Sequence, residues 1–222
     1  ASHELRTPLT ALQLQLHGIK EKAARVDAAL ADKVEKARRS TDRLAMLTEA
    51  LLDVARISTG RLALNLSEFE MGAAVKDVVE RLSESAQRSG TEISLDAQAG
   101  VKGCWDPLRV EQIVSNLISN AIKYAAGAKV EISVRGDDKE ACIVVRDHGP
   151  GIPMNALPRI FERFERGHSM RHFGGLGLGL YVAQQITEAH GGRIRAENAE
   201  GGGAKFTVNL PLKPTTPAPA AT

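Results

Sequence analysis

The chain of 222 residues carries 29 basic and 27 acidic side chains, a formal net charge of +2, and 43% hydrophobic residues. This composition is typical of a globular protein of one or two domains, and so small a net charge does not indicate general binding to nucleic acid or lipid. Two cysteines cannot form a disulfide scaffold and no apolar run approaches the ~20 residues of a membrane span, so a disulfide-rich secreted domain and a membrane core are excluded.

The first segment, residues 1–58, consists almost entirely of helix formers. Its apolar residues recur at steps of four and three, at Leu5, Leu9, Leu12, Leu16 and Ile19. A second, nearly heptad stripe follows at Val34, Ala37, Thr41, Leu44, Thr48, Leu51 and Ala55. The weak point between the stripes, at residues 25–32, predicts a helical hairpin. Because two such helices bury little surface alone, we expect a homodimer that completes a four-helix bundle.

Residues 59–212 mix helices and strands, and they predict an α+β sandwich of two layers. The expected helices are 72–89, 107–124 and 176–189. The expected strands are 61–66, 92–96, 130–135, 142–147, 193–197 and 204–210. A long loop rich in Gly, Pro, Arg and His occupies 148–175, and loops of that length inside a compact domain are often functional. The tail, 213–222, is expected to be disordered.

The start of the first helix carries a candidate nucleophile. At 100° per residue, His3 and Thr7 project from the face opposite the apolar stripe, with Glu4 on the flank beside His3. A carboxylate next to an exposed imidazole can orient or deprotonate the ring and make it a better nucleophile. Pro8 is expected to bend or loosen the helix just past His3. The alternative is a solvated histidine near a chain end.

The helix predicted at 107–124 carries an unusual polar face. Asn116, Asn120 and Lys123 cluster on this face, although asparagine is a poor helix former. Two amide oxygens side by side suit a hard cation such as Mg²⁺, and the lysine adds a positive charge for phosphate. The alternative is an ordinary solvent face, which would normally use Glu and Lys.

Two glycine-rich segments flank a basic loop. Asp147-His148-Gly149-Pro150-Gly151 follows an apolar strand, where a carboxylate could accept a hydrogen bond from an exocyclic amine such as that of adenine, and glycines let the backbone approach a flat ring. Residues 174–180, Gly-Gly-Leu-Gly-Leu-Gly-Leu, lead into a helix and could cradle phosphate. The loop between them indicates a lid over polyphosphate. A plain turn and a solvated loop are the alternatives.

Together these motifs resemble the sensor histidine kinases of two-component systems. Residues 3–9 look like the phosphoacceptor box, 116–124 like the asparagine box, and 147–151, 160–164 and 174–180 like the first glycine, phenylalanine and second glycine boxes. The boxes occur in the family's order, and the resemblance covers about residues 1–211. It implies a dimerisation hairpin at 1–58 and, at 59–212, the ATP-binding sandwich shared with type II topoisomerases, Hsp90 and MutL.

The resemblance also implies roles for individual residues. His3 would receive the γ-phosphoryl group of ATP, Glu4 would act as the neighbouring base, and Thr7 would orient water when the kinase dephosphorylates its partner. In the ATP site, Asn116 and Asn120 would hold Mg²⁺. The other expected ATP contacts are Lys123 and Tyr124 at the phosphates or ribose, Asp147 with Gly149 and Gly151 at the adenine, Arg166 at the γ-phosphate, Gly175, Gly177 and Gly179 at the hinge of the lid, and Leu180 at the end of the second glycine box.

The implied function is an ATP-dependent autokinase that passes its phosphoryl group to an aspartate on the receiver domain of a response regulator. The two domains would swing together about a joint near residues 58–60. Two alternatives stay open: a conformational ATPase of the Hsp90 or topoisomerase type, and a nucleotide-binding docking module without phosphotransfer. The sequence does not decide between phosphorylation in cis and in trans. It opens on Ala1-Ser2-His3, and we expect it to be the cytoplasmic portion of an inner-membrane receptor, with no membrane or nucleic-acid contact of its own.

Overall fold

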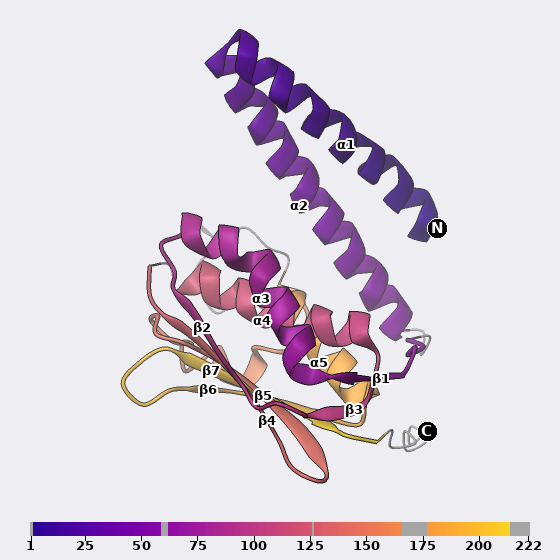
Figure 1. Cartoon of the computed structure of the whole chain (residues 1–222), viewed down its shortest axis with the longest axis vertical. Coiled ribbons are helices and arrows are strands. Elements are labelled where there is room, and N and C mark those ends of the chain that lie inside the picture. The colour runs from indigo at the N-terminus through magenta and orange to yellow at the C-terminus, as the bar shows by residue number, and fades with distance from the viewer. Residues whose placement is uncertain (1, 59–61, 126, 166–176, 214–222) are drawn as a thin grey trace. The chain divides into compact units, whose positions relative to one another are not determined.

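The computed structural model of this chain describes residues 2–58, 62–125, 127–165 and 177–213. The chain divides into two compact units, Ala1–Arg61 and Leu62–Thr222. The first unit contains two long helices, and the second contains helices and a sheet (Figure 1). The expected joint near 58–60 and the expected tail fall mostly outside the described residues.

The first unit is the predicted helical hairpin. Helix α1 spans Ser2–Val26 and helix α2 spans Ala28–Ser58, with the break at Asp27, inside the expected window. The Asp27 carboxylate accepts a hydrogen bond of 2.9 Å from the backbone N–H of Ala29, which stabilises the start of α2. Pro8 was expected to bend or loosen the helix just past His3. It lies inside α1, and the helix continues beyond it to Val26.

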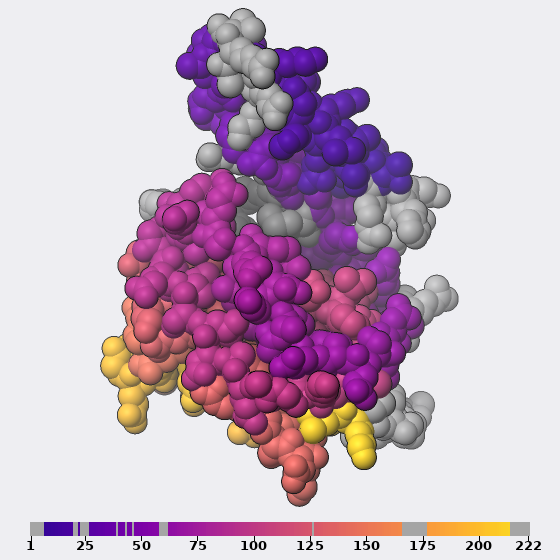
Figure 2. All heavy atoms as spheres, in the orientation of Figure 1, coloured from indigo at the N-terminus to yellow at the C-terminus, as the bar shows by residue number. Residues whose placement is uncertain are grey.

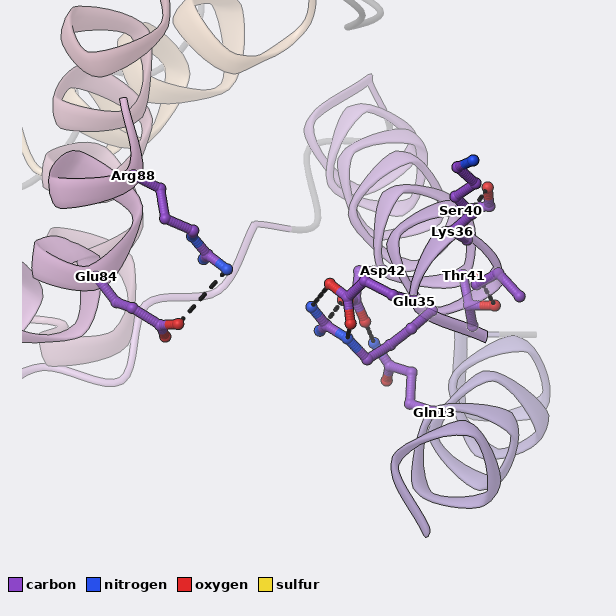
Figure 3. Close-up of polar contacts among 10 residues, drawn as sticks. Gln13, Glu35, Lys36, Ser40, Thr41, Asp42, Glu84 and Arg88 are labelled. Atoms are coloured by element: carbon purple, nitrogen blue, oxygen red, sulfur yellow. Dashed lines mark hydrogen bonds and ion pairs between the residues drawn. The ribbon is translucent and has the colours of Figure 1, made fainter. Parts of the chain in front are cut away.

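Polar side chains join the two helices of the hairpin (Figure 3). The Gln13 amide of α1 donates to Asp42 of α2 at 2.8 Å, and the other carboxylate oxygen of Asp42 accepts from Arg38 at 2.7 Å. Several apolar side chains on these helices nevertheless remain exposed: Leu12, Leu14, Ile19, Leu30, Leu44 and Leu51. One copy of the hairpin therefore leaves part of its apolar surface in water, as its stripe pattern predicts.

The second unit is the predicted two-layer α+β sandwich. Its helices are α3 (Met71–Arg88), α4 (Pro107–Tyr124) and α5 (Gly179–Ala189), with one short 3₁₀ turn, η1 (Leu157–Arg159). Its strands are β1 (Ser67–Glu70), β2 (Ile93–Ala97), β3 (Lys102–Trp105), β4 (Val130–Gly136), β5 (Glu140–Asp147), β6 (Arg193–Asn198) and β7 (Ala204–Pro211).

Five strands form one sheet in the order β2-β4-β5-β7-β6, and β1 pairs with β3 in a separate ribbon. The pair β2–β4 is parallel and the other pairs of the large sheet are antiparallel. The helices lie over one face of this sheet (Figure 1). In the space-filling view, atoms of α3 and α4 cover much of the visible face of this unit, and the strands emerge along its lower edge (Figure 2).

The core of this unit forms where helix faces meet the sheet. Helix α4 buries one apolar face, made of Val110, Ile113, Val114, Leu117, Ile118, Ala121 and Ile122. Strands β4 and β5 bury every second residue, as expected for strands with one face in the core. Because each fully buried aliphatic side chain contributes about 1.5–3 kcal/mol, this face fixes how α4 is rotated about its axis.

Three sequence predictions need correction. The strand expected at 61–66 is wrong, because residues 62–66 are irregular and the first strand is β1. Alternating apolar residues suggested a strand, but the backbone N–H of Asn65 donates to the Asp106 carboxylate at 2.8 Å and not to a neighbouring strand. Strand β3 was not expected, and α5 begins at Gly179, three residues later than predicted.

Asp106 caps α4 and also anchors the segment that enters the second unit. Its Oδ1 accepts from the backbone N–H of Arg109 at 3.1 Å, while its Oδ2 accepts from Asn65. Pro107 occupies the first helical position, where the missing N–H costs nothing. The carboxylate is buried, so both hydrogen bonds are shielded from water.

We expect Asp106→Ala to lower the free energy of unfolding of the second unit by about 1–2 kcal/mol, because the N-cap and the anchor of Asn65 are lost together. Urea unfolding followed by circular dichroism measures this change. Asp138→Ala, at an exposed turn position, is the matched control and should change the free energy by less than about 0.5 kcal/mol. Equal stability of the two variants would contradict the role given to Asp106.

Candidate functional site

The polar face of α4 meets the start of α5. The Asn116 side chain donates a hydrogen bond of 3.1 Å from Nδ2 to the backbone carbonyl of Gly179, which lies 63 positions further along the chain. A Cβ on Gly179 would lie 3.4 Å from the Asn116 amide oxygen, so the two segments are in close contact. Asn120 lies one helical turn beyond Asn116, on the same face and half-buried.

Lys123 and Tyr124 end this face of α4. The ammonium group of Lys123 lies 3.0 Å from the Tyr124 hydroxyl and 4.5 Å from the centre of its ring. Both side chains are half-buried. The tyrosine therefore holds a positive charge near the C-terminal end of α4, where it also complements the helix dipole.

The start of α5 offers backbone donors. Leu178 precedes the helix without a side-chain hydrogen bond that caps it, and Gly179 and the half-buried Leu180 form its first turn. The first N–H groups of a helix lack partners within the helix and suit an anion, particularly where glycine permits close approach. The amide face of α4 therefore lies beside a helix N-terminus of the kind that binds phosphate.

Asp147 ends the central strand β5 and is only 5% exposed. Its Oδ1 accepts from the backbone N–H of Gly149 at 2.9 Å and from that of Ala204 at 3.2 Å. Within the described part of the chain, both hydrogen bonds to this carboxylate end on Oδ1. The second oxygen can therefore accept a hydrogen bond from a ligand at the strand end.

The glycines near Asp147 are required by close backbone packing. A Cβ on Gly149 would approach the Cα of Ala125 to 2.9 Å, and a Cβ on Gly203 would overlap the backbone carbonyl of Asp147. Gly203 also has a φ of +87°, in the region that favours glycine. Sequence reasoning did not select Gly203, although the run 201–203 of three glycines was a visible signal.

Asn198 is a second residue that the sequence did not single out. Its side-chain amide accepts from the backbone N–H of Ile152 at 2.7 Å and donates to the carbonyl of the same residue at 2.8 Å. Gly151 has a φ of +75°, and a Cβ there would lie 2.8 Å from the amide oxygen of Asn198. The end of β6 therefore fixes the turn that follows Asp147.

A charged pair fixes the same turn from β4. Glu131 accepts from the Lys129 ammonium at 2.9 Å through Oε1, and its Oε2 lies 3.1 Å from Nε2 of His148. The hydrogen bonds from Lys129 and then from His148 lower the pKa of Glu131 to about 2. The carboxylate therefore stays ionised through the physiological pH range.

The middle of the expected lid contacts the second glycine-rich segment. The backbone N–H of Phe164 donates to the carbonyl of Gly177 at 3.1 Å. Gly177 has a φ of +69°, and a Cβ there would lie 2.5 Å from the carbonyl oxygen of Glu165. The Arg163 guanidinium donates to the Tyr181 hydroxyl on α5 at 2.7 Å. The expected contacts Arg166 and Gly175 lie outside the described residues.

The candidate phosphoacceptor segment forms the first turns of α1. His3 and Glu4 lie within this helix, but their side chains are outside the described part of the structure. Thr7 is exposed, as expected for a residue opposite the apolar stripe.

Among the described residues, no cluster of three His, Cys, Asp or Glu side chains could hold a metal, and no helix is long and apolar enough to cross a membrane.

Comparison with known proteins matches both units to families. Residues 1–60 match the His Kinase A (phospho-acceptor) domain, and residues 105–214 match the histidine kinase-, DNA gyrase B- and HSP90-like ATPase family. The Streptomyces coelicolor signal transduction histidine-protein kinase AfsQ2 is 38% identical over 228 residues, which cover 98% of this chain and 42% of the relative. The sensor protein kinase WalK of Staphylococcus aureus is 32% identical over 217 residues, which cover 96% of this chain and 52% of the relative. The chain thus spans about half the length of these relatives or less.

Solved histidine kinases share the fold. Full-length ShkA, whose crystal structure holds AMPPNP, superposes with a TM-score of 0.75 at 28% identity, over 99% of this chain and 46% of ShkA. The Acinetobacter baumannii histidine kinase AdeS gives a TM-score of 0.68 at 28% identity, over 95% of this chain and 98% of that structure.

Two glycines in one turn separate the cost of backbone strain from the cost of steric overlap. Gly201 and Gly203 both have positive φ, +84° and +87°, but a Cβ on Gly201 would meet nothing within 4 Å. We expect Gly201→Ala to cost about 1–2 kcal/mol of unfolding free energy, from the left-handed backbone alone. Gly203→Ala should cost clearly more, because its Cβ overlaps the Asp147 carbonyl.

Thermal unfolding of the two variants measures this difference. A Gly203→Ala protein no less stable than Gly201→Ala would show that the backbone beside Asp147 moves easily, and it would contradict the packing described above.

Proposed function

This chain belongs to the sensor histidine kinases of two-component systems, and we propose that it transfers the γ-phosphoryl group of ATP to its own His3. A ring nitrogen of His3 forms a bond to phosphorus as the bond between the γ-phosphorus and the bridging oxygen of ADP breaks. The phosphohistidine then donates to an aspartate of a response regulator. The proposal extends to the role of Glu4 as the neighbouring base and of Thr7 in orienting water for dephosphorylation.

One contact carries the proposal for the ATP site. The hydrogen bond between Asn116 and Gly179 joins the asparagine-bearing face of α4 to the glycine-rich start of α5. Amide oxygens and helix N-terminal N–H groups are complementary to a cation and to phosphate, respectively. Phosphoryl transfer needs positioning and charge neutralisation more than covalent work by the protein, so this convergence suits the reaction.

The proposed ATP contacts follow from the chemistry of each group. The second carboxylate oxygen of Asp147 accepts a hydrogen bond from the adenine amine, and Gly149 and Gly151 lie beside the adenine ring. Asn116 and Asn120 fit Mg²⁺ because they offer neutral oxygen donors, and Mg²⁺ neutralises phosphate charge when bound. The remaining proposed contacts are Lys123 and Tyr124 at phosphate or ribose, Arg166 at the γ-phosphate, and Gly175, Gly177, Gly179 and Leu180 in the glycine-rich segment.

We also propose that the chain works as a homodimer in the cytoplasmic portion of a membrane receptor. The exposed leucines of the hairpin support the dimer, because a second copy would remove them from water. The curated relatives are named as sensor or signal-transduction kinases and are about twice as long, which supports a larger receptor. The surface beside His3 is the proposed docking place of the response regulator.

Incubation with γ-labelled ATP and Mg²⁺ tests the kinase. We expect an acid-labile, alkali-stable label that disappears in His3→Ala and in Asn120→Ala. His17→Ala, an exposed histidine on the same helix, should keep the label and serves as the matched control. Label that survives His3→Ala would overturn the assignment of the phosphoacceptor. Free phosphate without labelled protein would favour a conformational ATPase, and nucleotide binding without either product would favour a docking module.

Sedimentation tests the dimer. Leu44 and Leu51 lie one heptad apart on α2 and are 52% and 50% exposed. We expect the wild-type chain to sediment as a dimer at high micromolar concentration and Leu44→Asp/Leu51→Asp to sediment as a monomer, because two buried carboxylates would oppose association. Leu108→Asp, on the second unit and 74% exposed, should leave the dimer intact. A wild-type monomer would contradict the proposal.

A further inference from the structure

His190 is a buried imidazole with both ring nitrogens engaged. It directly follows α5 and is 4% exposed. Its Nδ1 lies 2.8 Å from the carbonyl oxygen of Ile186, and its Nε2 lies 3.0 Å from the backbone nitrogen of Asp106. A carbonyl can only accept and a backbone N–H can only donate. The proton is therefore on Nδ1, and Nε2 is the acceptor for the N–H of Asp106.

The contact links the far ends of two helices that also meet at the candidate ATP site. At the first residue of α5, the Gly179 carbonyl accepts a hydrogen bond from Asn116 of α4. Directly after the last residue of α5, His190 accepts a hydrogen bond from Asp106, the N-cap of α4. The two helices pack against one another between these points. Because α5 is only 11 residues long, fixing one end constrains where the other end lies.

We propose that His190 is a positioning residue for nucleotide binding: by accepting the backbone N–H of Asp106 it holds α5 against α4, and so sets where the N-terminus of α5 meets Asn116. This inference rests on the proposed ATP site between these helices. His190 itself touches no substrate in this role.

The anchor on the α4 side is itself fixed. The Asp106 carboxylate accepts from the backbone N–H groups of Asn65 and Arg109, so the residue that donates to His190 is already held at two other points. A buried N–H that loses its acceptor costs more than an ordinary surface hydrogen bond, since water cannot replace the partner. His190 is therefore the point at which this network extends to α5.

Protonation should release the contact. A protonated imidazole carries N–H on both nitrogens, so Nε2 would face the N–H of Asp106 without a lone pair to offer. Burial lowers the pKa of His190. The hydrogen bond to the Ile186 carbonyl and the negative charge of Asp106 act in the opposite direction and raise it, but by less. The folded protein thus takes up this proton less readily than the unfolded chain. Stability from the contact is full above the ordinary histidine range, near pH 6.5, and is lost as the pH falls below it.

Calorimetric titration with Mg²⁺ and AMPPNP at pH 7.5 and pH 5.5 tests the proposal, with the unfolding midpoint read in the same samples. His190→Gln keeps an acceptor near the position of Nε2 but does not titrate, whereas His190→Leu has no acceptor. At pH 7.5 we expect His190→Gln to bind within about twofold of wild type and His190→Leu to bind about tenfold more weakly.

The pH comparison is the decisive reading. Acid will weaken binding in all proteins, because the terminal phosphate of the nucleotide also takes up a proton, so affinities are compared at pH 7.5 and the effect of pH is read in the unfolding midpoint. We expect wild type to lose more of its unfolding midpoint than His190→Gln between pH 7.5 and pH 5.5, because the unfolded chain takes up the proton that the buried His190 resists. His17→Gln, an exposed histidine of the hairpin, should behave as wild type.

Each outcome is informative. Equal acid loss of the unfolding midpoint in wild type and His190→Gln would overturn the proposal, as would wild-type affinity in His190→Leu. If His190→Leu does not fold, the comparison with His190→Gln still decides. If the wild-type chain does not bind AMPPNP at all, the proposed ATP site fails. The acid sensitivity of the unfolding midpoint, compared between wild type and His190→Gln, then tests the link between α4 and α5 by itself.

Discussion

Burial of one face of α4 is the constraint on which the second unit depends. Seven apolar side chains along this helix are buried, so its rotation about its axis is fixed. The opposite polar positions are fixed with it, and Asn116 is brought to the start of α5. The cap at the other end of α4 holds both the entry segment, through Asn65, and the end of α5, through His190. A packing requirement therefore determines the geometry of the candidate ATP site.

The sheet imposes a second constraint, at the end of β5. Asp147 is buried, and its Oδ1 is held by backbone N–H groups from two different segments, at Gly149 and Ala204. Such convergence needs backbones to approach more closely than any side chain allows, which is why glycine stands at 149 and 203. Glycine at these positions serves the geometry of one carboxylate. The second glycine-rich segment follows the same logic at Gly177, where the backbone of residues 164 and 165 leaves no room for a Cβ.

The two units divide the proposed chemistry between them. The hairpin supplies a long, regular helix that carries His3 in its first turns, and the sandwich supplies a site for nucleotide. Gln13 and Asp42 join the two helices of the hairpin, yet leucines on both helices remain exposed. The exposed leucines give the hairpin a surface that a second copy could cover, on the same hairpin that carries the proposed phosphoacceptor His3.

The sequence alone determined the helical hairpin, the extent of α4 and the order of the motifs, because helical periodicity and glycine spacing are local properties that survive without tertiary context. It also selected Asn116 and Asp147, whose residue types are unusual for their positions. Only the tertiary structure decided that residues 62–66 are irregular, that β3 pairs with β1, and that Gly203, Asn198 and His190 support the site. These features depend on contacts between segments 32 to 84 residues apart in the chain, such as Glu70 with Lys102 and Asp106 with His190. No local pattern encodes such contacts.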